Sequence, residues 1–328
     1  MTQACVIGSN SFSGASFCAH LLTRGIDVLA LSRSAEPHEV FLPYRWKPAK
    51  RTLQFEQLDL NHDLDRVMTL LSERKPRLVF NFAAQSMVGE SWDKPDDWMR
   101  TNVVTVARLA ERLRHVDFLD RYIHVTTPEV YGSTDSWITE NIPMNPSTPY
   151  AVSRAAGDML FKIYREAFGL PVVSTRAANV YGAGQPLYRI IPRTVFFLLT
   201  GRKLQLHGGG ASTRSFIHMD DVSSATWKIA NEAPVGETYH ISTDRVISIR
   251  ALVETLCRML GVNFEQSVDI VPEQLGKDSA YCLNSDKLRK LGWQDQIALE
   301  AGLTDVIDWA RSNLTQLEQQ PDGYIHKP

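Results

Sequence analysis

A tyrosine and an arginine lie four residues apart, in the segment Tyr-Ala-Val-Ser-Arg at Tyr150 to Arg154. In an α-helix this spacing places both side chains on one face. A cation beside a phenol lowers the pKa of that phenol, which helps a tyrosine to take and return a proton. The pair therefore predicts acid/base chemistry at Tyr150, with Arg154 as its cationic neighbour.

A turn with two glycines could hold the phosphates of a dinucleotide. Gly8 follows a short apolar strand, and Gly14 opens an amphipathic helix. Gly8 allows the tight turn, Gly14 permits close packing of helix on strand, and the helix N-terminus attracts a pyrophosphate. Ser11 stands at the middle glycine of a G-x-x-G-x-x-G pattern, so a purely structural turn is the alternative. We assign Gly8, Ser11, Phe12 and Gly14 to cofactor binding.

The residues after the second predicted strand distinguish the two nicotinamide cofactors. A carboxylate there would bind the ribose 2′-hydroxyl of NAD, but the chain has Ser32 and Arg33. Arg33 could pair with a 2′-phosphate, which predicts NADP, with NAD as the alternative; a solvated loop arginine would look the same. Asp59 ends the third predicted strand, where it could accept from adenine or cap a turn. The predicted cofactor site also includes Leu60, Ala83 and Ala84.

A repeating strand–helix pattern positions these residues. Such repeats predict a parallel sheet covered by helices on both faces, so the expected fold is α/β, with a Rossmann-type doubly wound sheet. The predicted strands cover 4–8, 26–31, 53–60, 78–84, 122–127 and 172–177, and the predicted helices cover 14–24, 63–74, 95–113 and 150–168.

The rhythm changes after Asn179. Prolines and the run Gly208 to Gly210 break the pattern, and the segments that follow are short, apart from helices predicted at 249–260 and 299–313. We predict a dinucleotide-binding domain over 1–178, with a return segment near 216–235. A smaller mixed α/β lobe, mainly over 179–328, is predicted to bind the substrate. Residues 37–50 are expected to form a loop.

Several ordered segments resemble the extended branch of the short-chain dehydrogenase/reductase superfamily. Tyr150 to Arg154 is similar to its Tyr-x-x-x-Lys signature, with arginine in place of lysine. Residues 81–88 and 91–95 resemble GDP-mannose 4,6-dehydratases, and 126–132 resembles the segment that carries the catalytic threonine and acid/base pair. Further matches at 179–182 and 214–222 extend the resemblance over nearly the whole chain. It implies a nucleotide-sugar 4,6-dehydratase.

The resemblance also implies a role for each catalytic residue. Tyr150 would deprotonate the sugar at O4 as the nicotinamide oxidises C4, Thr127 would polarise O4, and Glu129 would remove the C5 proton. Pro128 stands where many dTDP-glucose dehydratases carry an aspartic acid, and it has no proton to donate. Glu129 would then return its proton to the departing 6-hydroxyl. Arg154 would bind ribose hydroxyls.

The resemblance favours a GDP-mannose-like substrate, because Ala84-Gln85-Ser86 matches those dehydratases and Ser32-Arg33 suits a 2′-phosphate. Arg193 is expected to bind the substrate or to be a surface charge. Residues 276–281 resemble a segment near the nucleotide. The residues expected to bind the substrate are Ser86, Glu129, Asn179, Arg193 and Arg214.

Two alternatives stay open. A 4-epimerase or 4-oxidoreductase of the same family would need Thr127 and Tyr150 but not Glu129. A cofactor-binding protein with decayed catalysis would account for Pro128 and Arg154. The retained glutamate favours the dehydratase.

The composition limits the partners and the compartment. The formal net charge is -2, so no basic field favours nucleic acid, and four cysteines without metal-ligand spacing predict no metal site. No apolar run approaches the roughly 18 residues that span a bilayer, and no signal peptide is apparent, so we expect a cytoplasmic protein with no membrane partner. The resemblance implies a homodimer.

Overall fold

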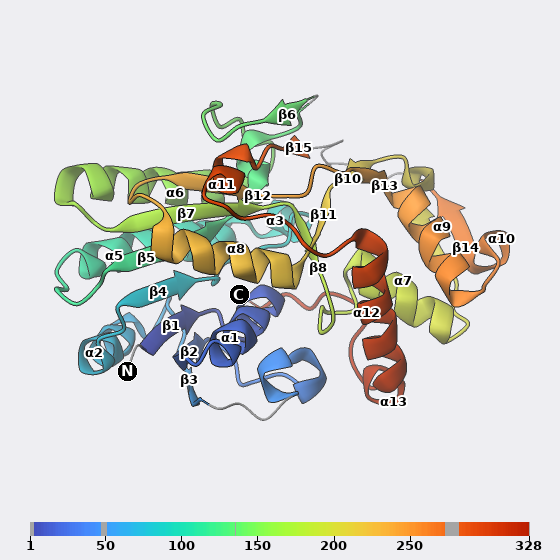
Figure 1. Cartoon of the computed structure of the whole chain (residues 1–328), viewed down its shortest axis with the longest axis horizontal. Coiled ribbons are helices and arrows are strands. Elements are labelled where there is room, and N and C mark those ends of the chain that lie inside the picture. Colours follow the sequence, from blue (N-terminus) through green and yellow to red (C-terminus); the bar gives the residue numbers. More distant parts are fainter. Residues whose placement is uncertain (1–2, 47–50, 135, 273–281, 328) are drawn as a thin grey trace.

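The computed structural model describes residues 3–46, 51–134, 136–272 and 282–327. Its large sheet consists of β1 (Gln3–Ile7), β2 (Asp27–Ser32), β3 (Leu53–Gln57), β4 (Leu78–Asn81), β5 (Arg121–Thr126), β7 (Val172–Ala177) and β12 (Thr238–Ile241). The strand order is β12-β7-β5-β4-β1-β2-β3, and every neighbouring pair is parallel. This arrangement confirms the predicted Rossmann-type α/β fold (Figure 1).

Helices cover both faces of the sheet because its strands are apolar on both sides. Ala4 and Val6 of β1 pack with α1 (Phe12–Thr23) and α8 (Met219–Glu232). Cys5 and Ile7 point to the opposite face and pack with α2 (Leu64–Arg74), α5 (Thr105–Leu113) and α6 (Pro149–Phe168). No helix within the described ranges is long and apolar enough to cross a membrane.

The helical segment predicted over 95–113 has the predicted bounds, but it is not a uniform α-helix. The segment divides into α4 (Pro95–Met99), a π-helical turn η3 (Arg100–Val104) and α5. Within the turn, Asn102 accepts from the backbone N–H of Gln85 at 3.0 Å and donates to its carbonyl oxygen at 2.9 Å. The same amide donates to Ser153 of α6 at 2.9 Å. The π turn therefore fixes the loop after β4 against α6, which is the local interaction that a plain helical period could not predict.

The later part of the chain forms the expected smaller lobe. Its apolar core unites α7 (Ile190–Leu199), α9 (Ile249–Leu260), α12 (Leu299–Ser312) and α13 (Leu314–Leu317). Short pairs accompany it: β6 (Trp137–Ile138) with β15 (Cys282–Leu283), β8 (Asn179–Tyr181) with β11 (Phe216–His218), β9 (Leu204–His207) with β14 (Val268–Val271), and β10 (Thr213–Arg214) with β13 (Ile247–Ser248). The remaining elements are α3 (Glu90–Asp93), α10 (Phe264–Ser267), α11 (Asp286–Lys290), η1 (Glu39–Phe41), η2 (Pro43–Arg45), η4 (Pro128–Tyr131) and η5 (Gly208–Gly210).

The chain crosses between the two parts more than once. After the lobe begins, α8 packs against α1 and β12 joins the edge of the large sheet. The domain limits at 178 and 216–235 stay a prediction. Residues 37–46, expected as a loop, contain η1 and η2, and Trp309 of α12 donates to the carbonyl oxygen of Val40 at 3.2 Å. Residues 47–50 lie outside the described ranges.

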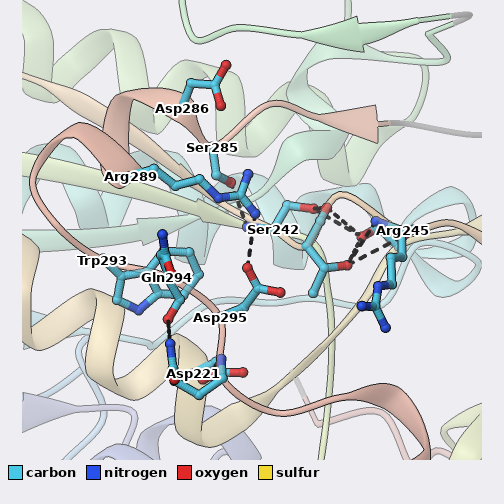
Figure 2. A network of polar contacts seen from close by, with 12 residues as sticks. Asp221, Ser242, Arg245, Ser285, Asp286, Arg289, Trp293, Gln294 and Asp295 are labelled. Carbon is cyan, nitrogen blue, oxygen red and sulfur yellow. Dashed lines mark hydrogen bonds and ion pairs between the residues drawn. The ribbon is translucent and has the colours of Figure 1, made fainter.

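A polar network fastens the segment 285–297 to the rest of the protein (Figure 2). The Asp221 carboxylate of α8 accepts from the backbone N–H groups of Gln296 and Ile297, each at 3.0 Å. The Ser285 hydroxyl accepts from the backbone N–H of Ser242, just after β12, at 2.8 Å. The network fixes the chain between β15 and α12 against α8 and the end of β12.

Candidate active site

A cleft of about 780 Å³ lies at the carboxyl ends of β1, β4, β5 and β7. This edge of a parallel sheet is where doubly wound folds bind their ligands. The predicted residues that line the cleft are Ser11, Phe12, Ala84, Ser86, Thr127, Glu129, Tyr150, Arg154, Asn179 and Arg214. Those that are not among its lining residues are Gly8, Gly14, Ser32, Arg33, Asp59, Leu60, Ala83 and Arg193.

The turn after β1 has the shape that a pyrophosphate requires. Gly8 has φ +83°, and a Cβ there would lie 2.5 Å from the backbone nitrogen of Ala83. A Cβ on Gly14 would lie 2.2 Å from the carbonyl oxygen of Gly8. The Ser11 hydroxyl donates to that oxygen at 2.7 Å and accepts from the Gly14 N–H at 3.1 Å, so it is bonded within the turn. The first turn of α1 can therefore present N–H groups to an anion.

The residues predicted to distinguish the cofactors lie at the end of β2 and after β3, outside the residues that line the cleft. Ser32 is buried, and its carbonyl oxygen pairs with the third strand. Arg33 is half-buried just beyond it. The Asp59 carboxylate accepts a backbone N–H two residues later at 2.8 Å, which is the turn role. Asn10, which the sequence reasoning missed, donates to the carbonyl oxygen of Ser34 at 2.7 Å and ties this loop to the glycine turn.

Tyr150 lies in the first turn of α6, where Thr148 caps the helix by accepting from the Ala151 N–H at 3.1 Å. Burial raises the pKa of Tyr150, and the Glu129 charge raises it further. The Arg154 charge and a hydrogen bond with Thr127 lower it but do not outweigh burial. The net direction is the opposite of the one predicted from the cation alone, because the sequence pattern does not show burial.

Arg154 is almost completely buried, at 3% exposure, one turn further along α6. Its guanidinium donates to the carbonyl oxygen of Val125, and its Nε lies buried with no hydrogen-bond partner. A buried donor without a partner is costly, so it marks a place where an acceptor fits. Because Arg154 lines the cleft, a ribose hydroxyl is a suitable acceptor, and these residues fit a nicotinamide dinucleotide.

Thr127 and Glu129 lie on the turn that follows β5. Thr127 caps η4 by accepting from the Glu129 N–H at 3.3 Å, and Pro128 occupies the first helical position, where its missing N–H is not needed. Glu129 is half-buried, whereas Thr127 is buried. Both side chains influence the pKa of Tyr150, so the carboxylate, hydroxyl and phenol share one part of the cleft.

A buried network behind the cleft connects η4 to α6. The Tyr131 hydroxyl contacts His240 at 2.8 Å and accepts from Arg176 of β7. Arg176 donates to Asp158 of α6 at 2.7 Å, and Asp158 lies 3.2 Å from His124 of β5. Burial alone would raise the pKa of Asp158, but His124 and Arg176 lower it to about 2. The network holds the turn bearing Glu129 at a fixed place relative to the helix bearing Tyr150.

The lobe contributes the other side of the cleft. Asn179 begins β8 and Arg214 lies on β10, and both line the cleft. Arg193 instead places its guanidinium 5.3 Å from the ring centre of Phe197. Arg189, one turn nearer the cleft, lines it and was missed, because the helical spacing alone does not show which turn reaches the ligand. Residues 276–281 lie outside the described ranges.

This combination defines a class. A Rossmann-type sheet, a glycine turn for a dinucleotide, and a tyrosine with a cation four residues later describe a nicotinamide-dependent protein of the short-chain dehydrogenase/reductase type. Residues 5–306 match the family described as GDP-mannose 4,6 dehydratase. The chain therefore belongs to this family of nucleotide-sugar 4,6-dehydratases, as the sequence predicted.

Individual relatives agree with the family. The chain is 34% identical over 241 residues to a dTDP-glucose 4,6-dehydratase of Mycolicibacterium smegmatis, with 72% of each chain covered. The solved structure of DesIV, a dTDP-glucose 4,6-dehydratase from Streptomyces venezuelae with NAD and TYD bound, is 31% identical. It superposes with a TM-score of 0.89 over 97% of this chain and 99% of that one.

A longer relative is a trifunctional UDP-glucose 4,6-dehydratase, 3,5-epimerase and reductase of Arabidopsis thaliana. The chain is 31% identical to it over 264 residues, which is 79% of this chain. This chain spans only 39% of that relative's length.

Proposed function

We propose that the protein is a nucleotide-sugar 4,6-dehydratase that converts a nucleoside diphosphate hexose into its 4-keto-6-deoxy form. The observation that carries this proposal is the shared placement of Tyr150, Thr127 and Glu129 in one cleft. An epimerase or 4-oxidoreductase would need the phenol and the threonine but would have no use for the carboxylate. A protein with decayed catalysis would not need the three groups to converge.

The chain's own residues account for the proton transfers. Tyr150 takes the O4 proton, and Thr127 and Arg154 favour the ionised phenol, as their effects on its pKa indicate. A bound nicotinamide would supply the hydride acceptor for C4 and the hydride donor for C6. Glu129 removes the C5 proton, which the 4-keto group acidifies, and returns a proton to the 6-hydroxyl as it leaves as water. Glu129 then takes a proton from solvent and donates it to C5 as hydride reaches C6, and Tyr150 returns the O4 proton to solvent. Pro128 takes no part, because it has no donor.

The identity of the base and of the sugar is a separate question from the class of substrate. The GDP-mannose prediction depended on the Ala84-Gln85-Ser86 match and on the Ser32-Arg33 pair. Within that match, the Gln85 side chain is 2% exposed and donates to the carbonyl oxygen of Lys327 at 2.6 Å. Gln85 is therefore engaged with the protein and does not line the cleft. The relatives named above act on dTDP-glucose or UDP-glucose, so we infer a glucose-configured pyrimidine nucleotide as the preferred substrate, with GDP-mannose as the alternative.

For the cofactor we propose NADP, with NAD as the alternative. Ser32 and Arg33 still supply no carboxylate for a ribose 2′-hydroxyl. Glu36, an acid in the loop that follows, is engaged by Tyr44 at 2.7 Å and by Arg45 at 2.8 Å. DesIV was solved with NAD, so both cofactors require titration. If Arg33 binds a 2′-phosphate, Arg33→Ala should weaken NADP binding and leave NAD binding unchanged.

We also propose a homodimer formed through α6. Val152, Met159 and Ile163 form an exposed apolar stripe along this helix, beside exposed Val104 of η3. Contiguous exposed apolar surface on a helix marks an interaction site. Light scattering should give twice the chain mass, and Ile163→Glu should give the monomer mass with unchanged circular dichroism. A wild-type monomer would contradict the proposal.

The activity is tested by incubating the purified protein with dTDP-, UDP- and GDP-hexoses and measuring product masses. Dehydration lowers the mass by the weight of one water, epimerisation leaves it unchanged, and a decayed protein converts nothing. Glu129→Gln should abolish dehydration while hydride transfer from C4 persists. Glu90→Gln alters the second carboxylate lining the cleft. If that variant loses elimination and Glu129→Gln keeps it, the assigned base is wrong.

A further inference from the structure

Residues 321–327, called the strap from here on, follow α13 and return from the lobe toward the large sheet (Figure 1). Exposure alternates along the strap: Asp322, Tyr324 and His326 are half-buried, and the residues between them are exposed. Alternation with a period of two means that one side of an extended chain is packed against the protein. The three half-buried residues contact three different places.

The first contact fixes the strap to the lobe. The Asp322 carboxylate lies 2.5 Å from the guanidinium of Arg202, just after α7. The Arg202 guanidinium also lies over the ring of Phe197, 4.0 Å from its centre. The strap therefore starts from a defined point on the lobe's core.

The last contacts fix the strap to the dinucleotide-binding part. The His326 ring stacks on buried Trp98 at 5.1 Å between centres and 8° between planes, and its Nε2 lies 2.7 Å from the Asp97 carboxylate. The next residue, Lys327, accepts from Gln85 through its carbonyl oxygen at 2.6 Å. Gln85 lies between two residues that line the cleft, Ala84 and Ser86. Both ends of the strap are therefore anchored, one on the lobe and the other beside the residues Ala84 and Ser86 that line the cleft.

Tyr324 lies between the two anchors. Its ring meets the ring of Tyr188, a cleft residue, edge to face at 5.4 Å. Burial raises the pKa of Tyr324, and the other groups that influence it are Tyr188, Glu90, Arg33 and Arg189. Arg33 follows β2, whereas Arg189 precedes α7. The phenol is thus within electrostatic range of the cofactor side and of the lobe side at once.

We propose that the strap closes one side of the cleft over the bound dinucleotide and slows its release, with Tyr324 as the residue that closes it. The inference rests on the proposed function for its purpose. A dehydratase returns to C6 the hydride it took from C4, so the cofactor ends each cycle as it began and has no need to leave. Slow release of the cofactor therefore does not slow turnover in such an enzyme. An enzyme that changes the oxidation state of its cofactor in each cycle must release the cofactor before the next one.

The test measures cofactor dissociation without any turnover. The full chain is loaded with labelled NAD or labelled NADP. Excess unlabelled cofactor is then added, and the rate at which the labelled cofactor leaves the protein is measured. Tyr324→Ala should release cofactor about tenfold faster, the size expected for losing an aromatic pair. The matched control is Ile325→Ala, because Ile325 is the neighbouring strap residue and is 64% exposed. Its release rate should stay within about twofold of the wild type.

Two further variants separate loss of the ring contact from a general loss of folding in Tyr324→Ala. Tyr324→Phe keeps the ring and should release cofactor at the wild-type rate, while His326→Ala should accelerate release by loosening the anchor at Trp98. Equal release rates in Tyr324→Ala and Ile325→Ala, or no binding of either cofactor, would overturn the proposal. If no nucleotide sugar is converted but Tyr324→Ala still accelerates release, the dehydratase assignment fails while the strap's role stands.

Discussion

Lowering the pH from 7 to 5 should destabilise the protein through His240. This residue of β12 is completely buried, and burial, followed by the Arg176 charge, lowers its pKa to about 3. In an unfolded chain a histidine has a pKa of about 6.5. Between these values the unfolded state binds a proton that the folded state does not. The contribution to stability is therefore fully present above about pH 6.5 and is lost progressively as the pH falls toward 3.

The size of the effect follows from linkage. One proton bound only by the unfolded state changes the free energy of unfolding by about 1.4 kcal/mol per pH unit. Integrated from pH 7 to pH 5, this gives a loss of about 2 kcal/mol from His240. His124 changes stability in the same direction, because burial lowers its pKa as well. Asp158 acts only at lower pH, since its pKa is about 2.

The assay is urea unfolding at both pH values, for the wild type and for His240→Asn. The variant should be less stable at pH 7, because Tyr131 loses its 2.8 Å partner. Its further loss between pH 7 and pH 5 should be smaller than that of the wild type by about 2 kcal/mol. Losses of equal size in both proteins would refute the assignment of a neutral, buried His240.

Three further outcomes follow from the site. Gly14→Ala should abolish dinucleotide binding, measured by calorimetry, because the new Cβ would lie 2.2 Å from a backbone oxygen. Arg189→Ala should raise the KM for the nucleotide sugar roughly tenfold or more, whereas Arg193→Ala should leave it nearly unchanged; the reverse result would restore the original prediction. Arg154→Met should raise the pKa of Tyr150 and shift the pH profile of C4 oxidation upward, with Arg154→Lys restoring it.

Much of the fold could be predicted because its strands are apolar on both faces and its helices have a clear period. The strand at Val172–Ala177 and the helix at Ile249–Leu260 have the predicted bounds. The errors come from long-range contacts. The π turn at 100–104 depends on Asn102 meeting Gln85 and Ser153, and hydrophobic periodicity carries no information about such a meeting.

The candidate site was predicted in two ways: Tyr150 and Arg154 from their spacing along a helix, and Thr127 and Glu129 from the resemblance of 126–132 to a family segment. Tyr150, Arg154, Thr127 and Glu129 reach the same cleft because each follows or begins a neighbouring element at one edge of the sheet. Gln85 shows the limit, since its neighbours Ala84 and Ser86 line the cleft while its own side chain points into the protein. The partner that holds Gln85 in the protein is Lys327 of the strap, which lies more than 200 positions away in the sequence. The local sequence around Gln85 therefore could not show which way its side chain points.

The proposed use of Glu129 for both proton transfers agrees with its exposure in the cleft. A glutamate that accepts the C5 proton and gives a proton to the leaving hydroxyl is ionised when the elimination ends. It must therefore take a proton from water before it can protonate C5. Glu129 is half-buried, which leaves it in contact with solvent, whereas Tyr150 and Arg154 are nearly enclosed. The carboxylate assigned to the elimination is thus more exposed than the phenol and the guanidinium assigned to the hydride transfer. Pro128 occupies the first helical position of the turn that carries Glu129. The Tyr131–Arg176–Asp158 network connects this turn to α6, the helix that carries Tyr150.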